Sequence, residues 1–477
     1  MILKWKLCAL MLWVWVTLYG QNVSIEALSP DYSGKAIHTI VAWNPFLTTH
    51  EYVSRVICDE NGRFELSMEL ESARVIQFET GVYQAYLYMQ PGFHYEVELP
   101  AYKEKEFSDQ ISPFFQAVVL PLRVRKRTSL STGDVVEGRQ DINYPIARFD
   151  TLFAMANNEV LMNRRTNKPS NLDSIILNLE SEFAWDSTRF FSAYRKYRYG
   201  VLKLNEGVTG LEELSREYLG PEVREWHPGF IELFRAMFKD FIYYYGRTPE
   251  GNKLANYINR TQDLDSARHV ILAHPAVWND TLADMILLQE LSEVFYRGDY
   301  HKEAILILLD SMIQDPVSPD FGVFAFQVRK KLASLVTGHL PPPFSLKDLA
   351  GNLVTLDDFR GRYVYLFFGT PDHYGCMMEY PFLQSYYEKH SDYLQVLTVM
   401  VSEEWEKLED FMLRNGYGWK VLHYEEQPGL LVDYLVRAFP TAYLIGPDGK
   451  LILSPSPLPS DGFEQQLFRI MRSRGEI

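Results

Sequence analysis

Residues 367–381 read FFGTPDHYGCMMEYP, and this stretch decides the fold of the last third of the chain. The apolar run at 363–368 predicts a buried strand, and the residues after Gly375 predict the start of a helix with Pro381 inside it. Cys376 would then lie in the first turn of that helix. Unpaired backbone N–H groups and the helix dipole favour negative charge there, so a sulfur that reaches them ionises more easily.

Further segments extend this pattern on both sides. Residues 343–349 (PFSLKDL) and 351–361 (GNLVTLDDFRG) predict a hairpin that leads into the strand, and residues 438–450 read AFPTAYLIGPDGK. In this order, the segments from about residue 340 to the C-terminus resemble the thioredoxin-like thiol–disulfide oxidoreductases of bacterial envelopes, the TlpA/ResA type, and more loosely the peroxiredoxins. The resemblance implies an α/β thioredoxin fold for this region.

The resemblance also assigns positions at the active site. Cys376 falls where the family has its second, resolving cysteine, and His373 falls where the family has its attacking cysteine. A thiolate attacks a disulfide and a second nearby thiol resolves the mixed species, so the degenerate His-x-x-Cys pattern predicts impaired dithiol catalysis. Pro440 matches the family's cis-proline. The resemblance implies that the loop of Phe439, Pro440 and Thr441 lies against the active site and offers backbone groups to an extended peptide.

Three interpretations of Cys376 stay open. It is a buried relic thiol in a domain that now only binds, or a monothiol whose thiolate is stabilised by a His373 imidazolium and which forms mixed disulfides. The third interpretation is a peroxiredoxin-like cysteine that attacks peroxide, although the Pro and Thr that usually precede such a cysteine are absent. Glu379 is expected to stabilise the helix start, with proton transfer as the alternative. Tyr374 is expected to fill part of the binding groove.

Composition limits the classes of function. At 477 residues the chain is long enough for two to four domains, and 47% hydrophobic with 14% aromatic residues supports well-packed globular domains. The net charge of −15 argues against nucleic acid and anionic membrane surfaces as main partners. No metal-ligand motif or phosphate loop occurs in the sequence, so neither a metal nor a cofactor is expected.

The first residues predict export. Positive charge at Lys4 and Lys6 precedes an almost wholly apolar run at 7–19, which is typical of a signal peptide and shorter than the ~20 residues that span a bilayer. A signal peptide at 1–20 implies a periplasmic or cell-envelope protein without an integral membrane domain in the mature chain. Cys58 and Cys376 would remain, in different domains, so a disulfide between them is not expected. A buried Cys58 acting as a small hydrophobe is the default.

The remaining pattern divides the mature chain into three domains. Short β-rich runs, with Asn61–Gly62 as a hairpin signal, predict an antiparallel sandwich at 21–100. Helix-length amphipathic segments predict an all-helical domain at 101–337, and stiff prolines at 338–343 introduce the thioredoxin-like domain at 338–477. The aromatic stripe of Phe230, Phe234, Phe238 and Phe241 is interpreted as core. The basic cluster of Arg123, Arg125, Lys126 and Arg127 is interpreted as a solvated face.

Together these patterns predict a multidomain α+β protein. The expected function of the redox-impaired thioredoxin fold is protein binding or envelope assembly, with a protein or peptide partner in the cell envelope. The alternative is an active monothiol oxidoreductase or a peroxiredoxin-like enzyme that uses Cys376.

Overall fold

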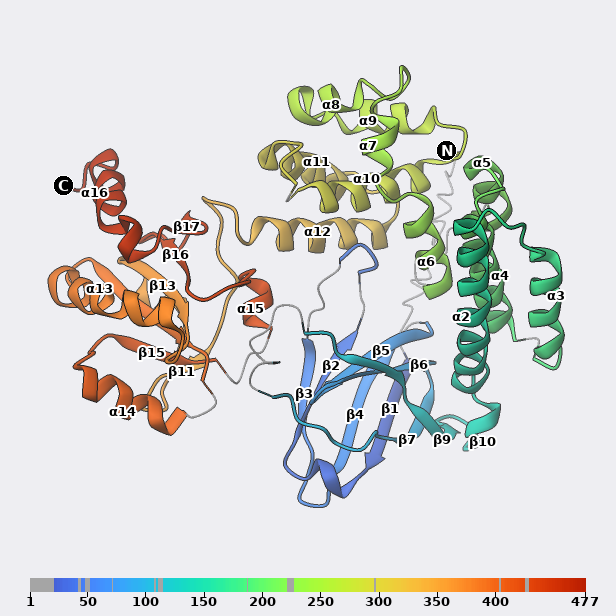
Figure 1. The fold of residues 1–477 in the computed structure, drawn as a ribbon, viewed down its shortest axis with the longest axis horizontal. Coiled ribbons are helices and arrows are strands. Elements are labelled where there is room, and N and C mark those ends of the chain that lie inside the picture. Colours follow the sequence, from blue (N-terminus) through green and yellow to red (C-terminus); the bar gives the residue numbers. More distant parts are fainter. Residues whose placement is uncertain are drawn as a thin grey trace, which may run out of the picture.

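A computed structural model of the chain contains three parts: a β-sandwich, a helical domain and an α/β domain at the C-terminus (Figure 1). The predicted multidomain α+β architecture is therefore confirmed. The predicted signal peptide at 1–20 lies outside the described residues. The structure describes residues 21–41, 44–47, 52–70, 72–106, 109, 115–186, 188–220, 227–295, 297–402, 405–424 and 429–477. Within those ranges no helix is both long and apolar enough to cross a membrane.

The sandwich consists of two five-stranded sheets, with strand orders β10-β9-β7-β1-β4 and β3-β2-β5-β6-β8. Alternate residues of the strands face a shared core, as in β5, where buried and half-buried side chains alternate along the strand. Most neighbours are antiparallel, but β1 pairs with β7 and β6 pairs with β8 in parallel. The strands are β1 (Gln21–Leu28), β2 (Ala36–Val41), β3 (Tyr52–Ile57), β4 (Arg63–Leu70), β5 (Arg74–Thr80), β6 (Tyr83–Met89), β7 (Phe93–Glu98), β8 (Val118–Pro121), β9 (Arg123–Ser129) and β10 (Val135–Glu137).

The predicted domain boundary at residue 100 is wrong, because β8, β9 and β10 belong to the two sheets. The basic cluster forms part of β9, and its Arg123 and Arg125 side chains are exposed beside the acidic strand β7. Arg125 pairs with Glu98 at 3.0 Å, and Lys126 pairs with Glu96 at 2.7 Å. Cross-strand charge pairs stabilise a sheet. The cluster therefore belongs to the sandwich, and the first long helix of the described chain, α2, begins at Asn143.

The Asn61–Gly62 turn is present, but it does not close a hairpin. It joins β3 to β4, which pair with β2 and β1 in different sheets. Gly62 has φ +76°, and a Cβ atom there would lie 1.9 Å from the Ser29 carbonyl oxygen. The Gly62 carbonyl accepts a hydrogen bond from the Ser29 N–H at 3.0 Å. Glycine is thus required by a close backbone approach at the edge between the sheets.

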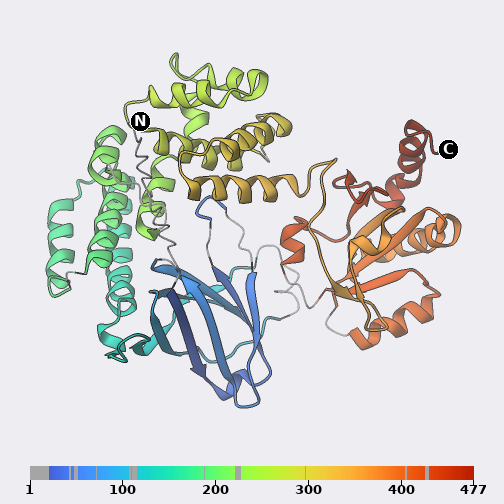
Figure 2. The same ribbon diagram turned by 180° about the vertical axis from the view of Figure 1, so that it is seen from behind.

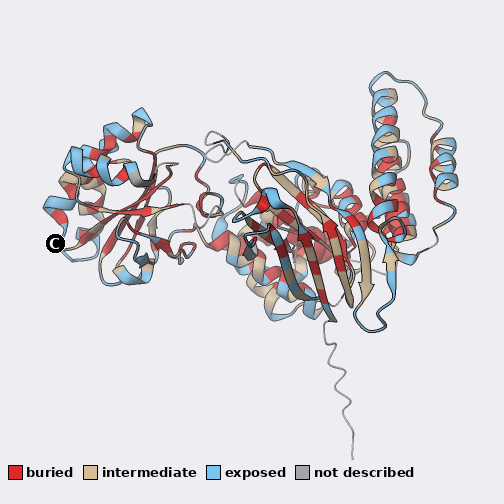
Figure 3. Cartoon of the chain, turned by 90° about the horizontal axis from the view of Figure 1, so that it is seen from below, coloured by how far each residue is buried: buried red, intermediate tan, exposed pale blue. Residues whose placement is uncertain are grey.

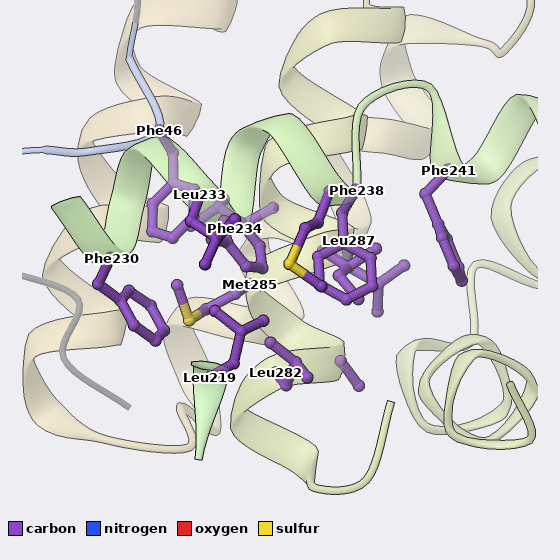
Figure 4. Packing of buried hydrophobic residues seen from close by; sticks show 14 of the residues in the cluster. Phe46, Leu219, Phe230, Leu233, Phe234, Phe238, Phe241, Leu282, Met285 and Leu287 are labelled. Carbon is purple, nitrogen blue, oxygen red and sulfur yellow. The ribbon is translucent and has the colours of Figure 1, made fainter. Parts of the chain in front are cut away.

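The helical domain surrounds an aromatic core that includes the predicted phenylalanine stripe (Figure 4). Phe230, Phe234 and Phe238 are fully buried and Phe241 is 6% exposed, so the interpretation as core is confirmed. The helical segment that carries this stripe is interrupted at Asp240, which has φ +57°. The helices are α2 (Asn143–Arg165), α3 (Leu172–Glu182), α4 (Arg189–Glu206), α5 (Leu211–Leu214), α6 (Pro228–Met237), α7 (Phe241–Tyr245), α8 (Leu254–Asn256), α9 (Leu264–Leu272), α10 (Asp280–Val294), α11 (Lys302–Gln314) and α12 (Pro319–Ala333).

A loop of the sandwich enters the helical core. Phe46 is 3% exposed, and its ring lies 5.8 Å from the ring of Phe324 and 6.1 Å from that of Phe321. Asn44 donates its side-chain N–H to the Phe324 carbonyl at 2.8 Å. The loop and α12 lie side by side in both views (Figures 1 and 2). These contacts fix the sandwich against the helices, because an aromatic anchor in a packed core allows little movement.

The C-terminal domain has a sheet of order β15-β14-β13-β16-β17, with β13, β14 and β15 parallel and β16 and β17 antiparallel to their neighbours. Helices α13, α14 and α16 cover one face, and α15 with the β11–β12 hairpin covers the other. The elements are β11 (Leu346–Lys347), β12 (Leu353–Val354), β13 (Tyr363–Gly369), α13 (Tyr374–His390), β14 (Leu394–Met400), α14 (Trp405–Asn415), β15 (Lys420–His423), α15 (Leu430–Asp433), β16 (Thr441–Ile445), β17 (Leu451–Leu453) and α16 (Phe463–Ser473).

The predicted stiff linker is docked on the C-terminal sheet. Gly338 donates its N–H to the Leu451 carbonyl at 2.7 Å, and Leu451 donates to the His339 carbonyl at 2.9 Å. The Tyr434 hydroxyl donates to the Pro342 carbonyl at 2.8 Å. The C-terminal domain forms a separate lobe whose strands are mostly buried (Figure 3). The linker therefore attaches this lobe directly to the end of α12.

Candidate functional site

The site begins where β13 ends. All seven residues of β13 are buried, and the chain then turns through Thr370 before α13 starts at Tyr374. The Thr370 hydroxyl accepts the His373 backbone N–H at 3.2 Å, and the Thr370 carbonyl accepts the Tyr380 hydroxyl at 2.5 Å. These two hydrogen bonds join the turn at Thr370 to helix α13. The predicted strand, turn and helix are confirmed.

Cys376 lies in the first turn of α13 and has no exposed surface. Burial raises the pKa of its thiol from 9.0 to about 11. Hydrogen bonds with the Thr370 backbone and the Tyr380 side chain favour the thiolate, while the charge of Glu379 opposes it. Desolvation outweighs these hydrogen bonds, because burial penalises the charged form most. Within the described chain, Cys376 and Cys58 are both free and buried, and Cys58 lies in the sandwich core.

His373 and Pro440 both lie close to Gly375. A Cβ atom on Gly375 would be 3.2 Å from both Nδ1 and Cε1 of His373 and 3.4 Å from Cδ of Pro440. The Phe439–Pro440 peptide bond is cis, as predicted. The imidazole is exposed at the N-cap of α13, whereas the Cys376 thiol lies below the surface. The surface of the site is therefore formed by an imidazole, a glycine backbone and a proline ring.

Comparison with known proteins supports the frame of this site. The AhpC/TSA family matches residues 337–454. The thiol–disulfide oxidoreductase ResA of Geobacillus thermodenitrificans is 30% identical over 132 residues, which are 28% of this chain and 75% of that protein. ResA of Bacillus subtilis is 31% identical over 121 residues, which are 25% of this chain and 66% of that protein.

This chain belongs to the thioredoxin-like thiol–disulfide oxidoreductase family. The family relationship concerns the C-terminal domain. The thioredoxin domain of a thiol–disulfide oxidoreductase from Bacteroides vulgatus is 25% identical, covers 29% of this chain and 99% of its own, and has a TM-score of 0.27. A putative thiol:disulfide interchange protein DsbE from Chlorobium tepidum is 27% identical, with 28% and 98% coverage and a TM-score of 0.26.

Glu379 is buried beside the thioredoxin-like site, with 4% exposure. Its two carboxylate oxygens accept the Ser460 N–H at 2.9 Å and the Ser460 hydroxyl at 2.5 Å. Ser460 lies in the short 3-10 helix Pro459–Asp461, which precedes α16. A buried carboxylate with two such donors holds two segments together. The carboxylate therefore joins α13 to the segment before α16, which is a structural role other than the expected stabilisation of the helix start.

The start of α13 presents an apolar surface to solvent. Tyr374 is 72% exposed, Met378 53% and Phe382 44%, and their spacing of four residues places them on one side of the helix. Met377 beside them is 42% exposed. Tyr374 thus lies at the rim of the site and does not fill a groove in the unbound chain. We call Tyr374, Met377, Met378 and Phe382 the α13 rim.

The other predicted loop residues are placed beside Pro440. Phe439 is half-buried and packs against the hydrophobic clusters on both faces of the sheet. The Thr441 hydroxyl donates to the Ala438 carbonyl at 2.7 Å, which tightens the loop around the cis bond. No group of three or more potential metal ligands occurs within the described ranges. The structure places the predicted residues His373, Cys376 and Pro440 together at one end of the sheet.

Sequence reasoning missed a cleft beside this loop. It has a volume of about 450 Å³ and continues from Pro440 and Thr441 to the helical domain. Phe295 and Lys302 line it from the helical side, and Arg437 lines it from the loop. Phe295 follows α10, and Lys302 begins α11. Only the relative placement of the domains brings these two residues beside the cis-proline.

Proposed function

We propose that the thioredoxin-like domain binds an extended polypeptide segment across the start of α13 and the cis-Pro440 loop, without a dithiol cycle. The complete burial of Cys376 carries this proposal. A redox enzyme needs an accessible thiolate to attack a disulfide. His373 occupies the exposed position at the helix start, where the family resemblance expects the attacking cysteine.

The electrostatics of Cys376 support the same conclusion. With a pKa of about 11, fewer than about one thiol in 1,000 is ionised at pH 7.5. The sequence contains no other cysteine within 300 residues of Cys376, so a resolving partner from nearby in the chain is lacking. His373 contacts the Cys376 residue through a backbone hydrogen bond, Cys376 N–H to His373 O at 2.9 Å. The imidazolium-stabilised thiolate is thus less favoured than the buried relic.

The surface suits a polypeptide. Pro440 and Thr441 are both partly exposed at the rim of the site, where Thr441 begins strand β16 and an added strand can use backbone groups. The α13 rim contributes a tyrosine, two methionines and a phenylalanine. Exposed methionine and aromatic side chains are typical of adaptable binding surfaces. We further propose that the chain is exported to the cell envelope, where the predicted signal peptide would direct it.

Binding of fluorescein-labelled octapeptides that alternate leucine and serine tests this function by fluorescence anisotropy with the full chain. We expect Tyr374→Asp to weaken binding at least ten-fold, because it places a charge in an apolar contact. Leu413→Asp is the matched control, since Leu413 is 71% exposed on α14 and lies outside the α13 rim. Cys376→Ser should leave binding unchanged. No binding, or equal loss in both aspartate variants, contradicts the proposal, as does a loss of binding in Cys376→Ser, because the proposal gives the thiol no part in binding.

A further inference from the structure

The cleft beside the cis-Pro440 loop has walls from two domains. Its apolar wall comes from the end of α12 and the segment after it, where Leu332 and Val336 are 3% and 8% exposed. The opposite wall is the start of β16 with the turn after β17, including Ser454 and Ser456. Its volume of about 450 Å³ lies within the range of about 300–1,000 Å³ that ligand pockets occupy.

The charged groups of this cleft have one sign. Lys302 and Arg437 both belong to its lining, both are exposed, and no carboxylate occurs among the described lining residues. The Lys302 ammonium lies 5.4 Å from the centre of the buried Phe295 ring. A cation beside apolar walls favours an acidic side chain next to an apolar one. This positive cleft stands out in a chain whose net charge is −15.

The two walls are fixed relative to each other. Lys331 in α12 pairs with Asp433 in α15 at 2.5 Å. The Ser454 hydroxyl donates to the Leu335 carbonyl at 2.7 Å, directly at the cleft. Together with the docked linker, these bonds tie the helical domain to the thioredoxin-like domain on both sides of the opening. The cleft is therefore preformed in the unbound chain, and binding of a ligand costs little conformational entropy of the protein.

We propose that the helical domain supplies the second half of the peptide site and selects segments that combine acidic and apolar residues. This inference rests on the proposed function, because the segment must cross Pro440 before it enters the cleft. A partner segment would place an acidic side chain between Lys302 and Arg437. An apolar side chain next to it would contact Leu332 and Val336.

The test uses three fluorescein-labelled octapeptides in which leucine alternates with aspartate, serine or lysine, bound to the full chain and followed by anisotropy. We expect the aspartate peptide to bind at least ten-fold more tightly than the lysine peptide. The double variant Lys302→Glu/Arg437→Glu should reverse this order. Lys330→Glu is the matched control, since Lys330 is exposed on α12 but does not line the cleft, and should keep the order of the native chain.

The outcomes separate this inference from the function on which it rests. An acidic preference that the double variant reverses and Lys330→Glu retains supports the two-domain site. Binding that Tyr374→Asp weakens but that shows no charge preference, or a preference insensitive to the double variant, overturns the inference and leaves the proposed function standing. Absence of binding for all three peptides overturns both. Circular dichroism of each variant establishes that a lost preference is not a lost fold.

Discussion

Glu290 in α10 should make the helical domain less stable as the pH rises towards neutrality. The side chain is 1% exposed, and burial raises the pKa of its carboxyl from 4.5 to about 7. One oxygen accepts the Ile242 N–H at 2.9 Å and thereby holds the start of α7, while the other has no hydrogen-bond partner among the described residues. The folded state therefore retains a proton that the unfolded chain releases above pH 4.5.

This difference in proton binding determines the sign and the size of the pH effect on the free energy of unfolding. Because the folded state binds more protons between pH 4.5 and 7, the free energy of unfolding falls with rising pH through that range and levels off above it. A pKa raised from 4.5 to about 7 corresponds to an upper limit of about 3.4 kcal/mol. Glu290→Gln keeps an acceptor for Ile242 and cannot ionise. Its stability should match that of the native chain near pH 4.5 and exceed it by up to about 3 kcal/mol at pH 8.

Urea unfolding followed by circular dichroism at 222 nm measures this effect, because that signal comes mainly from the helices. The difference between variant and native chain at each pH removes contributions from other titrating groups. Glu293→Gln is the control, since Glu293 lies on the same helix with a 26% exposed side chain that pairs with Arg297 at 3.8 Å. A difference between Glu290→Gln and the native chain that stays constant from pH 4.5 to 8 would refute the reasoning.

Three further changes test other parts of the fold and site. Phe46→Ala should cost about 3–5 kcal/mol and expose the sandwich loop to limited proteolysis, because it leaves a cavity between Phe321 and Phe324; unchanged stability and cleavage would contradict the anchor. Gly62→Ala should destabilise the sandwich by more than about 1 kcal/mol in thermal unfolding, because its Cβ would meet the Ser29 carbonyl at 1.9 Å; a neutral result would contradict that close approach. His373→Cys should give disulfide reductase activity absent from the native chain, measured by insulin reduction, because strand, helix start and cis-proline are in place; no activity would mean that the groove has diverged further.

The elements that could be predicted are those whose signal is local. The run that became β13 is continuously apolar, the Phe230 to Phe241 stripe follows helical spacing, and the Pro440 loop follows the family pattern. Each of these needs only a few neighbouring residues to be recognised.

The errors come from contacts between distant residues. The predicted boundary at residue 100 falls before β8 and β9, because only their pairing with β6 and β7 joins them to the sheets of the sandwich. Asn61–Gly62 has the composition of a hairpin turn, and only the pairing of β3 and β4 in different sheets shows otherwise. The cleft could not be predicted for the same reason, since Lys302 and Arg437 are 135 positions apart in the sequence. Strand pairing and the cleft depend on contacts between residues far apart in the sequence, and local propensity carries no information on such contacts.

Alkylation of Cys376 as a function of pH tests the central claim most directly. Native chain is treated with iodoacetamide, and the Cys376 and Cys58 peptides are followed separately by mass spectrometry, with denatured chain as the fully reactive reference. A buried thiol with a pKa of about 11 should react at pH 7.5 at least about 100-fold more slowly than a free thiol of pKa ~8.5. Rapid labelling with a midpoint well below pH 8.5 would contradict the account and identify Cys376 as a working monothiol.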